Sequence, residues 1–229
     1  MQPYIFPYLG YFHLIEASDT FIFYDDVNYI KRGWINRNRI GLNNKAHRFT
    51  LPIKKASQNV LIKDTRVNLD KSWQKSFFST LTQAYRTAPH FDATVALIEG
   101  TFIDQEENTI SSLAIRSIEH VYRYLEIKPN FIKSSVFSPE TRGLERSERL
   151  IQITKKLGYN SYINLLGGKE LYTKEYFRHH GINLNFIKSL DHSYKQHSDI
   201  FIPALSIIDI LMFNDKEATK HLFHNFTLI

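Results

Sequence analysis

Short apolar runs alternate with longer amphipathic segments along most of this chain, and this alternation restricts the folds open to it. The short runs are rich in β-branched and aromatic residues, which favours buried strands. The longer segments repeat apolar residues at helical spacing, which favours helices that cover a core. Strands that alternate with helices indicate an α/β fold, in which a parallel sheet carries helices on both faces.

The expected elements follow one another without a linker or an internal repeat. We predict extended or strand segments at 2–6, 20–24, 48–53, 60–67, 131–137, 161–166 and 183–189. We predict helices at 11–18, 70–87, 92–101, 108–126, 143–158, 170–179 and from 206 onward. The length of 229 residues suits one domain, 1–229, with room for a small helical lobe around 70–126. The fold expected from this order is Rossmann-like.

The uncharged opening, MQPYIFPYLGYFHLI, does not have the pattern of a secretory signal. No basic residue precedes its apolar run, and Pro3 and Pro7 interrupt it. The later apolar stretch 201–213 is too short to span a bilayer, which takes about 20 residues. The chain has no cysteine, so disulfides and thiol nucleophiles are excluded. We expect a cytoplasmic protein without membrane insertion.

The opening segment is the first of three loops in which we expect chemistry, because ligands of parallel α/β folds bind where the strands end. Gly10 would allow a ligand to approach the backbone, and the helix that starts beside it would favour an anion. Gln2, Tyr8 and Tyr11 would line the floor of such a site. The alternative is a turn that prolines and aromatic residues shape for stability alone.

The second loop, YDDVNYIKRGWINRNRI at 24–40, follows an expected strand. Two adjacent carboxylates, Asp25 and Asp26, can hold Mg²⁺ or a ribose hydroxyl, or orient an amine. The rest of the loop has no acid, and its basic, amide and aromatic side chains suit phosphate and a stacked base or sugar. These side chains are Tyr29, Lys31, Arg32, Trp34, Arg37, Asn38 and Arg39. The alternatives are a solvated hairpin and a surface for single-stranded nucleic acid.

The third loop, YINLLGGKELY at 162–172, joins a strand to a helix through Gly167 and Gly168. Backbone N–H groups there could meet a phosphate beside Asn164, although a Gly-Gly pair is more commonly a tight turn. Metal-binding and nucleotide-binding motifs such as HExxH and Walker A are absent, and we predict no metal site. Asp209 lies inside an apolar helix, where an acid is usually hydrogen-bonded for structure and otherwise reaches into a site.

Several stretches of the chain resemble the WbqC-like proteins of bacterial surface-polysaccharide gene clusters. The matching stretches are QPYIFPYLGYFHLI, YDDVNYIKRGWINRNRI, ERLIQITKKLGYNSYINLLGGKELY and SIIDILMFN, and together they extend over essentially the full length. The resemblance implies a role in the synthesis of O-antigen, the outer part of lipopolysaccharide, or of a related glycan. It further implies that an aminoacyl group such as glycyl is added to an amino sugar such as a 4-amino-4,6-dideoxyhexose.

The opening also resembles the start of HIGH-type nucleotidyltransferases and of pantothenate synthetase. Residues 7–11 fall where those enzymes have a His-x-Gly-His turn, but both histidines are missing and tyrosines stand near their places. This resemblance implies a nucleotidyltransferase-like (HUP) core. The donor stays open between ATP with Mg²⁺ and an aminoacyl-tRNA.

We therefore predict an amide-forming transferase or ligase that acylates the amine of a nucleotide-linked, dTDP-type amino sugar. Asp25 or Asp26 would accept the proton of the amine, since acyl transfer requires a neutral amine held close to the acyl carbon. Lys31 and the arginines would hold the diphosphate or stabilise developing charge. The alternatives are a nucleotidyltransferase-like or nucleic-acid-binding protein without acyl transfer, and a non-catalytic scaffold of glycan assembly.

Overall fold

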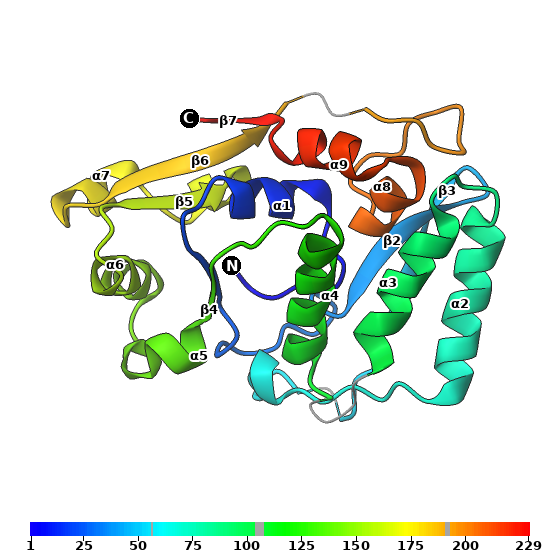
Figure 1. The fold of residues 1–229 in the computed structure, drawn as a ribbon. Coiled ribbons are helices and arrows are strands. Elements are labelled where there is room, and N and C mark those ends of the chain that lie inside the picture. Colours follow the sequence, from blue (N-terminus) through cyan, green and yellow to red (C-terminus); the bar gives the residue numbers. More distant parts are fainter. Residues whose placement is uncertain (56, 104–107, 191–192) are drawn as a thin grey trace.

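The computed structural model describes residues 1–55, 57–103, 108–190 and 193–229 (Figure 1). The strands are β1 (Phe21–Phe23), β2 (Arg37–Leu42), β3 (Lys45–Thr50), β4 (Phe131–Lys133), β5 (Ser161–Leu165), β6 (Asn183–Ser189) and β7 (Phe226–Leu228). They form three small sheets. β1 pairs with β4 in parallel, and β2 with β3 as an antiparallel hairpin. β5 pairs with β6 in parallel, and β7 runs antiparallel on the other side of β6.

The helices surround these sheets. They are α1 (Leu9–Glu16), α2 (Lys71–Tyr85), α3 (Phe91–Ile103), α4 (Ile110–Tyr124), α5 (Ser134–Phe137), α6 (Arg146–Lys156), α7 (Lys174–His179), α8 (Ile207–Phe213) and α9 (Lys216–Phe223). Short 3₁₀ segments occupy Ile62–Asp64, Pro139–Thr141 and Leu166–Glu170. Several helices begin at a residue whose side chain accepts a backbone N–H, such as Asp70 before α2 and Thr109 before α4. These caps explain why α2 and α4 begin within two residues of their predicted starts at 70 and 108.

The predicted α/β content is confirmed, but the predicted Rossmann-like parallel sheet is not found, because the described residues form three small sheets instead of one large parallel sheet. The parallel pairs β1–β4 and β5–β6 stay separate. The expected strand 131–137 ends after Lys133, where α5 begins at once. The expected strand 60–67 is wrong: it contains a 3₁₀ turn and makes only isolated bridges, including Ile53 with Val67.

The β2–β3 hairpin was not foreseen, because charged residues disguise its alternation. Asn38 and Ile40 are buried on one face of β2, whereas Arg37, Arg39 and Gly41 are less buried on the other. Leu42 pairs with Lys45, so Asn43 and Asn44 alone form the loop, with φ values of +50° and +57°. Two left-handed residues define a type I′ turn, a geometry that asparagine tolerates.

The main hydrophobic cluster joins the opening segment, α1, β1, the helices α2–α4 and α8. A smaller cluster lies between α6, α7 and the β5–β6 pair, around Ile151, Phe177 and Phe186. Figure 1 shows α2, α3 and α4 on one side of the molecule and β5, β6 and α7 on the other, with α1 between them. Among the described residues, no helix combines the length and the apolar character needed to cross a membrane.

Candidate functional site

The opening segment makes a sharp turn at Phe6, which is fully buried and has a φ of +39°. This left-handed conformation is rare for an aromatic residue and persists only where neighbours hold it. The carbonyl oxygen of Phe6 accepts hydrogen bonds from the Asn38 amide and from Ser206 Oγ, the latter at 2.7 Å. Its N–H donates to Ser117 Oγ at 3.0 Å. Side chains from β2, α4 and the start of α8 therefore fix the path of the segment.

The turn places the opening segment against residues 30–39, and the two enclose an open pocket of about 520 Å³. We call it the N-terminal pocket. Of the predicted site residues, it is lined by Gln2, Tyr8, Tyr11, Trp34 and Arg39. Tyr4 also lines it and was missed from the sequence, although it lies in the same apolar opening. The structure thus brings the first two of the predicted loops together.

Tyrosines form the floor of this pocket. The ring of Tyr4 has its centroid 6.3 Å from that of Tyr8 and 6.4 Å from that of Tyr11. The Tyr11 hydroxyl donates to the backbone oxygen of Gln2 at 3.0 Å. Burial raises the pKa of all three phenols, so at neutral pH they are hydrogen-bond donors and not bases.

Gly10 does not line the pocket but allows its shape. A Cβ atom at Gly10 would lie 2.6 Å from Cε2 of Tyr8, so the Tyr8 ring can cover the start of α1 only because residue 10 has no side chain. Gly10 was predicted to let a ligand approach the backbone, whereas the group that approaches it is this ring.

Arg39 supplies a positive charge to the pocket. Its guanidinium carbon lies 5.5 Å from the ring centroid of Trp34, and Nη2 donates to the carbonyl oxygen of Ala204 at 3.2 Å. Its Nε is buried and has no hydrogen-bond partner within the described part of the chain. The Trp34 side chain is 49% exposed. A guanidinium beside an exposed aromatic face suits a ligand that joins an anionic group to a ring.

Asp25 and Asp26 are not among the residues that line this pocket. Both are buried at the end of β1, with exposed fractions of 2% and 3%. Asp25 accepts from the N–H and the hydroxyl of Ser135, at 3.0 and 2.8 Å. Asp26 accepts from Ser134 Oγ at 2.6 Å and from Arg149 Nη2 at 2.6 Å. The two carboxylates thus connect β1 to the start of α5 and to α6.

Arg149 completes this buried network. Its Nε donates to Thr141 Oγ1 at 3.0 Å, and its guanidinium carbon lies 4.4 Å from the ring centroid of Tyr24. Sequence reasoning missed Arg149, Ser134 and Ser135. The serines directly follow the strand at 131–133, so the rule that sites form where strands end would have found them. Nothing in the helical pattern distinguishes Arg149 from a surface arginine.

The other residues of the second loop take different positions from those predicted. Tyr29 is buried and donates to Asn36 Oδ1 at 2.8 Å, so its ring is not free to stack on a ligand. Asn38 is fully buried and donates to the carbonyl oxygens of Ile5 and Phe6, which makes it a support of the turn and not a ligand contact. Residues that lie outside the pocket lining are Lys31 and Arg32, both exposed, and Arg37, half-buried.

The third loop lies apart from the N-terminal pocket. Asn164 lines a smaller cavity of about 160 Å³ between β1, α6 and β5. Its Oδ1 accepts the N–H of Leu165 at 2.8 Å, and a Cβ on Gly168 would lie 2.8 Å from its Nδ2. Gly167 and Gly168 form part of a 3₁₀ turn, and the predicted helix begins only at Lys174. The phosphate contact predicted for this loop stays a prediction.

His13 lies in a structural environment on the first helix. It is fully buried on α1, and its ring nitrogens lie 2.9 Å from Ser189 Oγ and 2.9 Å from the carbonyl oxygen of Leu222. These contacts join α1 to β6 and α9. Within the described ranges, no cluster of three or more His, Asp or Glu side chains could hold a metal ion.

Comparison with known proteins assigns the chain to a family. The model of the WbqC-like protein family matches residues 2–221. A protein of Mycobacterium tuberculosis (strain ATCC 25618 / H37Rv), described as uncharacterized protein Rv1507c, is 27% identical over 218 residues, which are 94% of this chain and 93% of that protein. No solved structure matches the chain. The family match extends over nearly the whole sequence, and the chain belongs to the WbqC-like protein family.

Proposed function

We propose that this protein acylates the amine of a nucleotide-linked amino sugar during surface-polysaccharide synthesis, and that the N-terminal pocket binds the sugar nucleotide. The observation that carries the proposal is Arg39, which lines the pocket and whose guanidinium lies beside the exposed ring of Trp34. A diphosphate would accept charge-assisted hydrogen bonds from the guanidinium. A sugar or base would stack on the exposed indole ring.

The size and polarity of the pocket agree with this ligand class. Its volume of about 520 Å³ lies within the range of small-molecule sites, roughly 300–1,000 Å³. The phenols of Tyr4 and Tyr8 stay protonated because burial raises their pKa values, so they can donate to sugar hydroxyls or phosphate oxygens. A deoxy sugar would place its apolar edge on the tyrosine rings.

The proton of the amine cannot go to Asp25 or Asp26 in this proposal, because both are buried and their oxygens already accept hydrogen bonds. We assign them a positioning role at the end of β1. The sugar nitrogen forms a bond to the acyl carbon of the donor, and the bond from that carbon to the leaving oxygen breaks. With an aminoacyl-tRNA donor, the leaving ribose oxygen takes up the proton that the amine loses.

The relation to HIGH-type nucleotidyltransferases enters the proposal as a fold analogy. The support for this analogy is that the start of the chain lies parallel to β1. The Met1 amine donates to the Ile22 oxygen at 2.7 Å, and the Met1 oxygen accepts the Tyr24 N–H at 2.8 Å. The opening segment therefore runs beside β1, on the other side from β4. An ATP-dependent donor would follow from this analogy, and an aminoacyl-tRNA donor would not need it.

The activity test uses the purified protein with a dTDP-4-amino-4,6-dideoxyhexose. One reaction contains glycine, ATP and Mg²⁺, and a second contains glycyl-tRNA. Mass spectrometry of the sugar nucleotide should show one added glycyl group in one of the two. Arg39→Met should abolish the product, whereas Arg178→Met, a matched loss of charge on the exposed face of α7, should retain it. No mass gain with either donor would overturn the proposal.

Nucleic-acid binding is the second candidate, because exposed basic residues lie in the loop that borders the N-terminal pocket and on the β2–β3 hairpin that follows it. Lys31 and Arg32 precede β2, and Lys45 and Arg48 lie on β3. A tRNA held there should bind less tightly as salt is added, since phosphate contacts release counterions. Binding that is insensitive to salt would exclude this candidate.

A further inference from the structure

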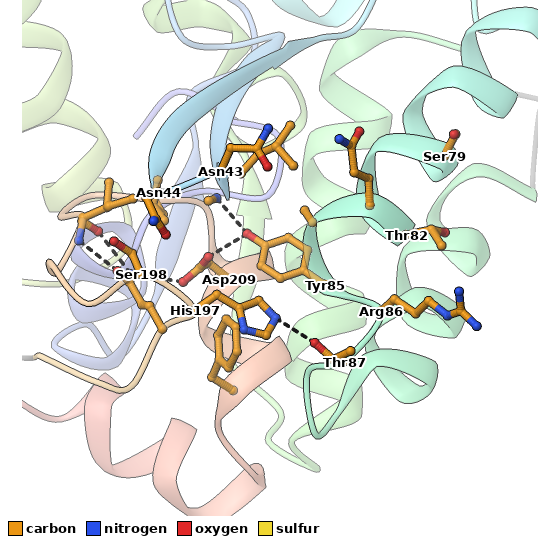
Figure 2. Close-up of a pocket in the computed structure, with 18 residues that line it drawn as sticks. Asn43, Asn44, Ser79, Thr82, Tyr85, Arg86, Thr87, His197, Ser198 and Asp209 are labelled. Atoms are coloured by element: carbon orange, nitrogen blue, oxygen red, sulfur yellow. Dashed lines mark hydrogen bonds between the residues drawn. The ribbon is translucent and has the colours of Figure 1, made fainter.

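A second and larger hollow, of about 910 Å³, lies away from the tyrosines of the N-terminal pocket. We call it the α2 cleft, because α2 forms one of its walls. The tip of the β2–β3 hairpin and the segment 196–205 form the opposite wall. Figure 2 shows Ser79 and Thr82 of α2 on one side of the hollow and Asn44 and Ser198 on the other, with the Arg86 side chain directed away from them.

The base of the α2 cleft is a rigid group of hydrogen-bonded side chains. Asp209 is 1% exposed, and its carboxylate accepts from the hydroxyl of Tyr85 at 2.6 Å and from that of Tyr194 at 2.8 Å. Gln196 Nε2 donates to the same carboxylate at 3.1 Å, and the N–H of Gly41 donates to the Tyr85 hydroxyl at 2.9 Å. Asp209 is therefore hydrogen-bonded, as an acid inside an apolar helix usually is, and it also lies at the base of a cleft.

Neutral polar groups on the walls are open to solvent. The side chains of Asn43, Asn44, Ser79 and Gln83 line the cleft, are exposed, and make no hydrogen bond to another described residue. The type I′ turn of the hairpin explains why asparagine occupies residues 43 and 44. It does not explain why their amide groups line a cleft that hydroxyl and amide groups of α2 also line. These groups can both donate and accept hydrogen bonds.

The charges around the cleft are few and mixed. Arg86 and His197 are the basic residues of its lining, and Asp209 is the acidic one. His197 is already engaged, since its Nε2 lies 3.4 Å from Thr87 Oγ1 and its ring packs on Phe213 with centroids 4.9 Å apart. A buried carboxylate at the base would repel a phosphate or another anion, and the polar walls do not suit the apolar chain of a lipid.

We propose that the α2 cleft is a second ligand site, and that it binds a neutral saccharide. Side-chain amides and hydroxyls match the paired donors and acceptors of sugar hydroxyls. The half-buried Phe213 ring provides apolar surface at the base for the C–H face of a pyranose. The hydrogen bonds to Asp209 hold Tyr85 in place before a ligand arrives.

The α2 cleft and the N-terminal pocket lie on the same face of β2. Arg39 lines the pocket and Gly41, two residues further, lines the cleft. Ala204 belongs to the pocket and Leu205 to the cleft, so the chain before α8 separates the two. The saccharide site does not depend on acyl transfer, and it would stand if the function proposed above failed.

The test is saturation-transfer NMR of the full chain with methyl glycosides of glucose, galactose, mannose, rhamnose, N-acetylglucosamine and N-acetylgalactosamine. We expect at least one glycoside to receive saturation from the protein. Thr82→Trp should weaken its binding by roughly tenfold or more, because the indole would fill the cleft from the exposed surface of α2. Thr82 donates only to the Phe78 oxygen within its own helix, so the variant should fold.

Ser72→Trp is the matched control, nearly three turns earlier on α2 and outside the cleft lining, and it should bind like the wild type. The thermal midpoint of both variants checks that they fold. Absence of saturation transfer to every glycoside would overturn the proposal. Equal binding by Thr82→Trp and the wild type would also overturn it, as would displacement of the glycoside by dTDP, which would identify the cleft as a nucleotide site.

Discussion

Replacement of Arg149 by methionine should destabilise the protein far more than loss of a surface charge. The Arg149 and Asp26 side chains are 4% and 2% exposed, and their charged atoms lie 2.6 Å apart. Methionine keeps much of the side-chain volume but removes the guanidinium. Among the described residues, Asp26 then keeps the hydroxyl of Ser134 as its one side-chain partner, in a buried environment.

The magnitude follows from this burial. Removal of one member of a buried ion pair costs about 3–5 kcal/mol, because the remaining charge is left uncompensated. A domain of this size has a total free energy of unfolding of roughly 5–15 kcal/mol. At about 2–4 °C per kcal/mol, the thermal midpoint should fall by roughly 6–20 °C. The cost of about 3–5 kcal/mol includes the loss of the hydrogen bond from Arg149 to Thr141.

The assay is urea unfolding followed by circular dichroism. Arg146→Met is the control, since Arg146 is exposed at the start of the same helix and should change the free energy by less than about 0.5 kcal/mol. Asp26→Asn combined with Arg149→Met should be less destabilised than the sum of the single variants, because no charge is left unpaired. A loss below about 1 kcal/mol for Arg149→Met would refute the reasoning.

Three further predictions concern the turn, the pocket and the cleft. Asn38→Ala should lower the free energy of unfolding by about 1–3 kcal/mol, since the buried carbonyl oxygen of Phe6 loses a donor; urea unfolding measures it, and a change under about 0.5 kcal/mol would contradict it. Gly10→Ala should displace the Tyr8 ring and weaken sugar-nucleotide binding in calorimetry, while stability changes by less than about 1 kcal/mol, because the ring borders an open pocket into which it can rotate. Unchanged affinity would show that the position of the ring is irrelevant. Burial raises the folded pKa of Asp209 above 3.8, so the wild type should lose stability relative to Asp209→Asn as the pH rises from 3.8 to the folded pKa; a stability difference that is constant with pH in urea unfolding would contradict this.

The helices were predictable because their information is local. Apolar spacing and capping residues lie within each segment, as in α4, where Thr109 and Ser112 cap each other. The sheets were less predictable, because strands of three residues such as β1 and β4 carry little pattern and their pairing joins residues far apart in sequence. Residues 60–67 alternate like a strand, but no neighbouring strand pairs with them along their length.

The same distinction applies to the site. The sequence pointed to the opening segment and to residues 24–40, and part of each lines the N-terminal pocket, although their roles stay predictions. It could not show that Asp26 would be neutralised, because Arg149 lies 123 residues further along the chain and Ser134 lies 108 residues further. Nor could it show that Asn38 would face the buried backbone, since that depends on the unpredicted hairpin.

The turn at Phe6 links the pocket to the completion of folding. Its three supports lie at residues 38, 117 and 206, so the N-terminal pocket cannot have its final shape on the ribosome until residue 206 has emerged. An incomplete chain would therefore be unable to capture the ligand. For the same reason, a ligand bound there stabilises the entire fold and not only the opening loop, because it binds only the assembled state.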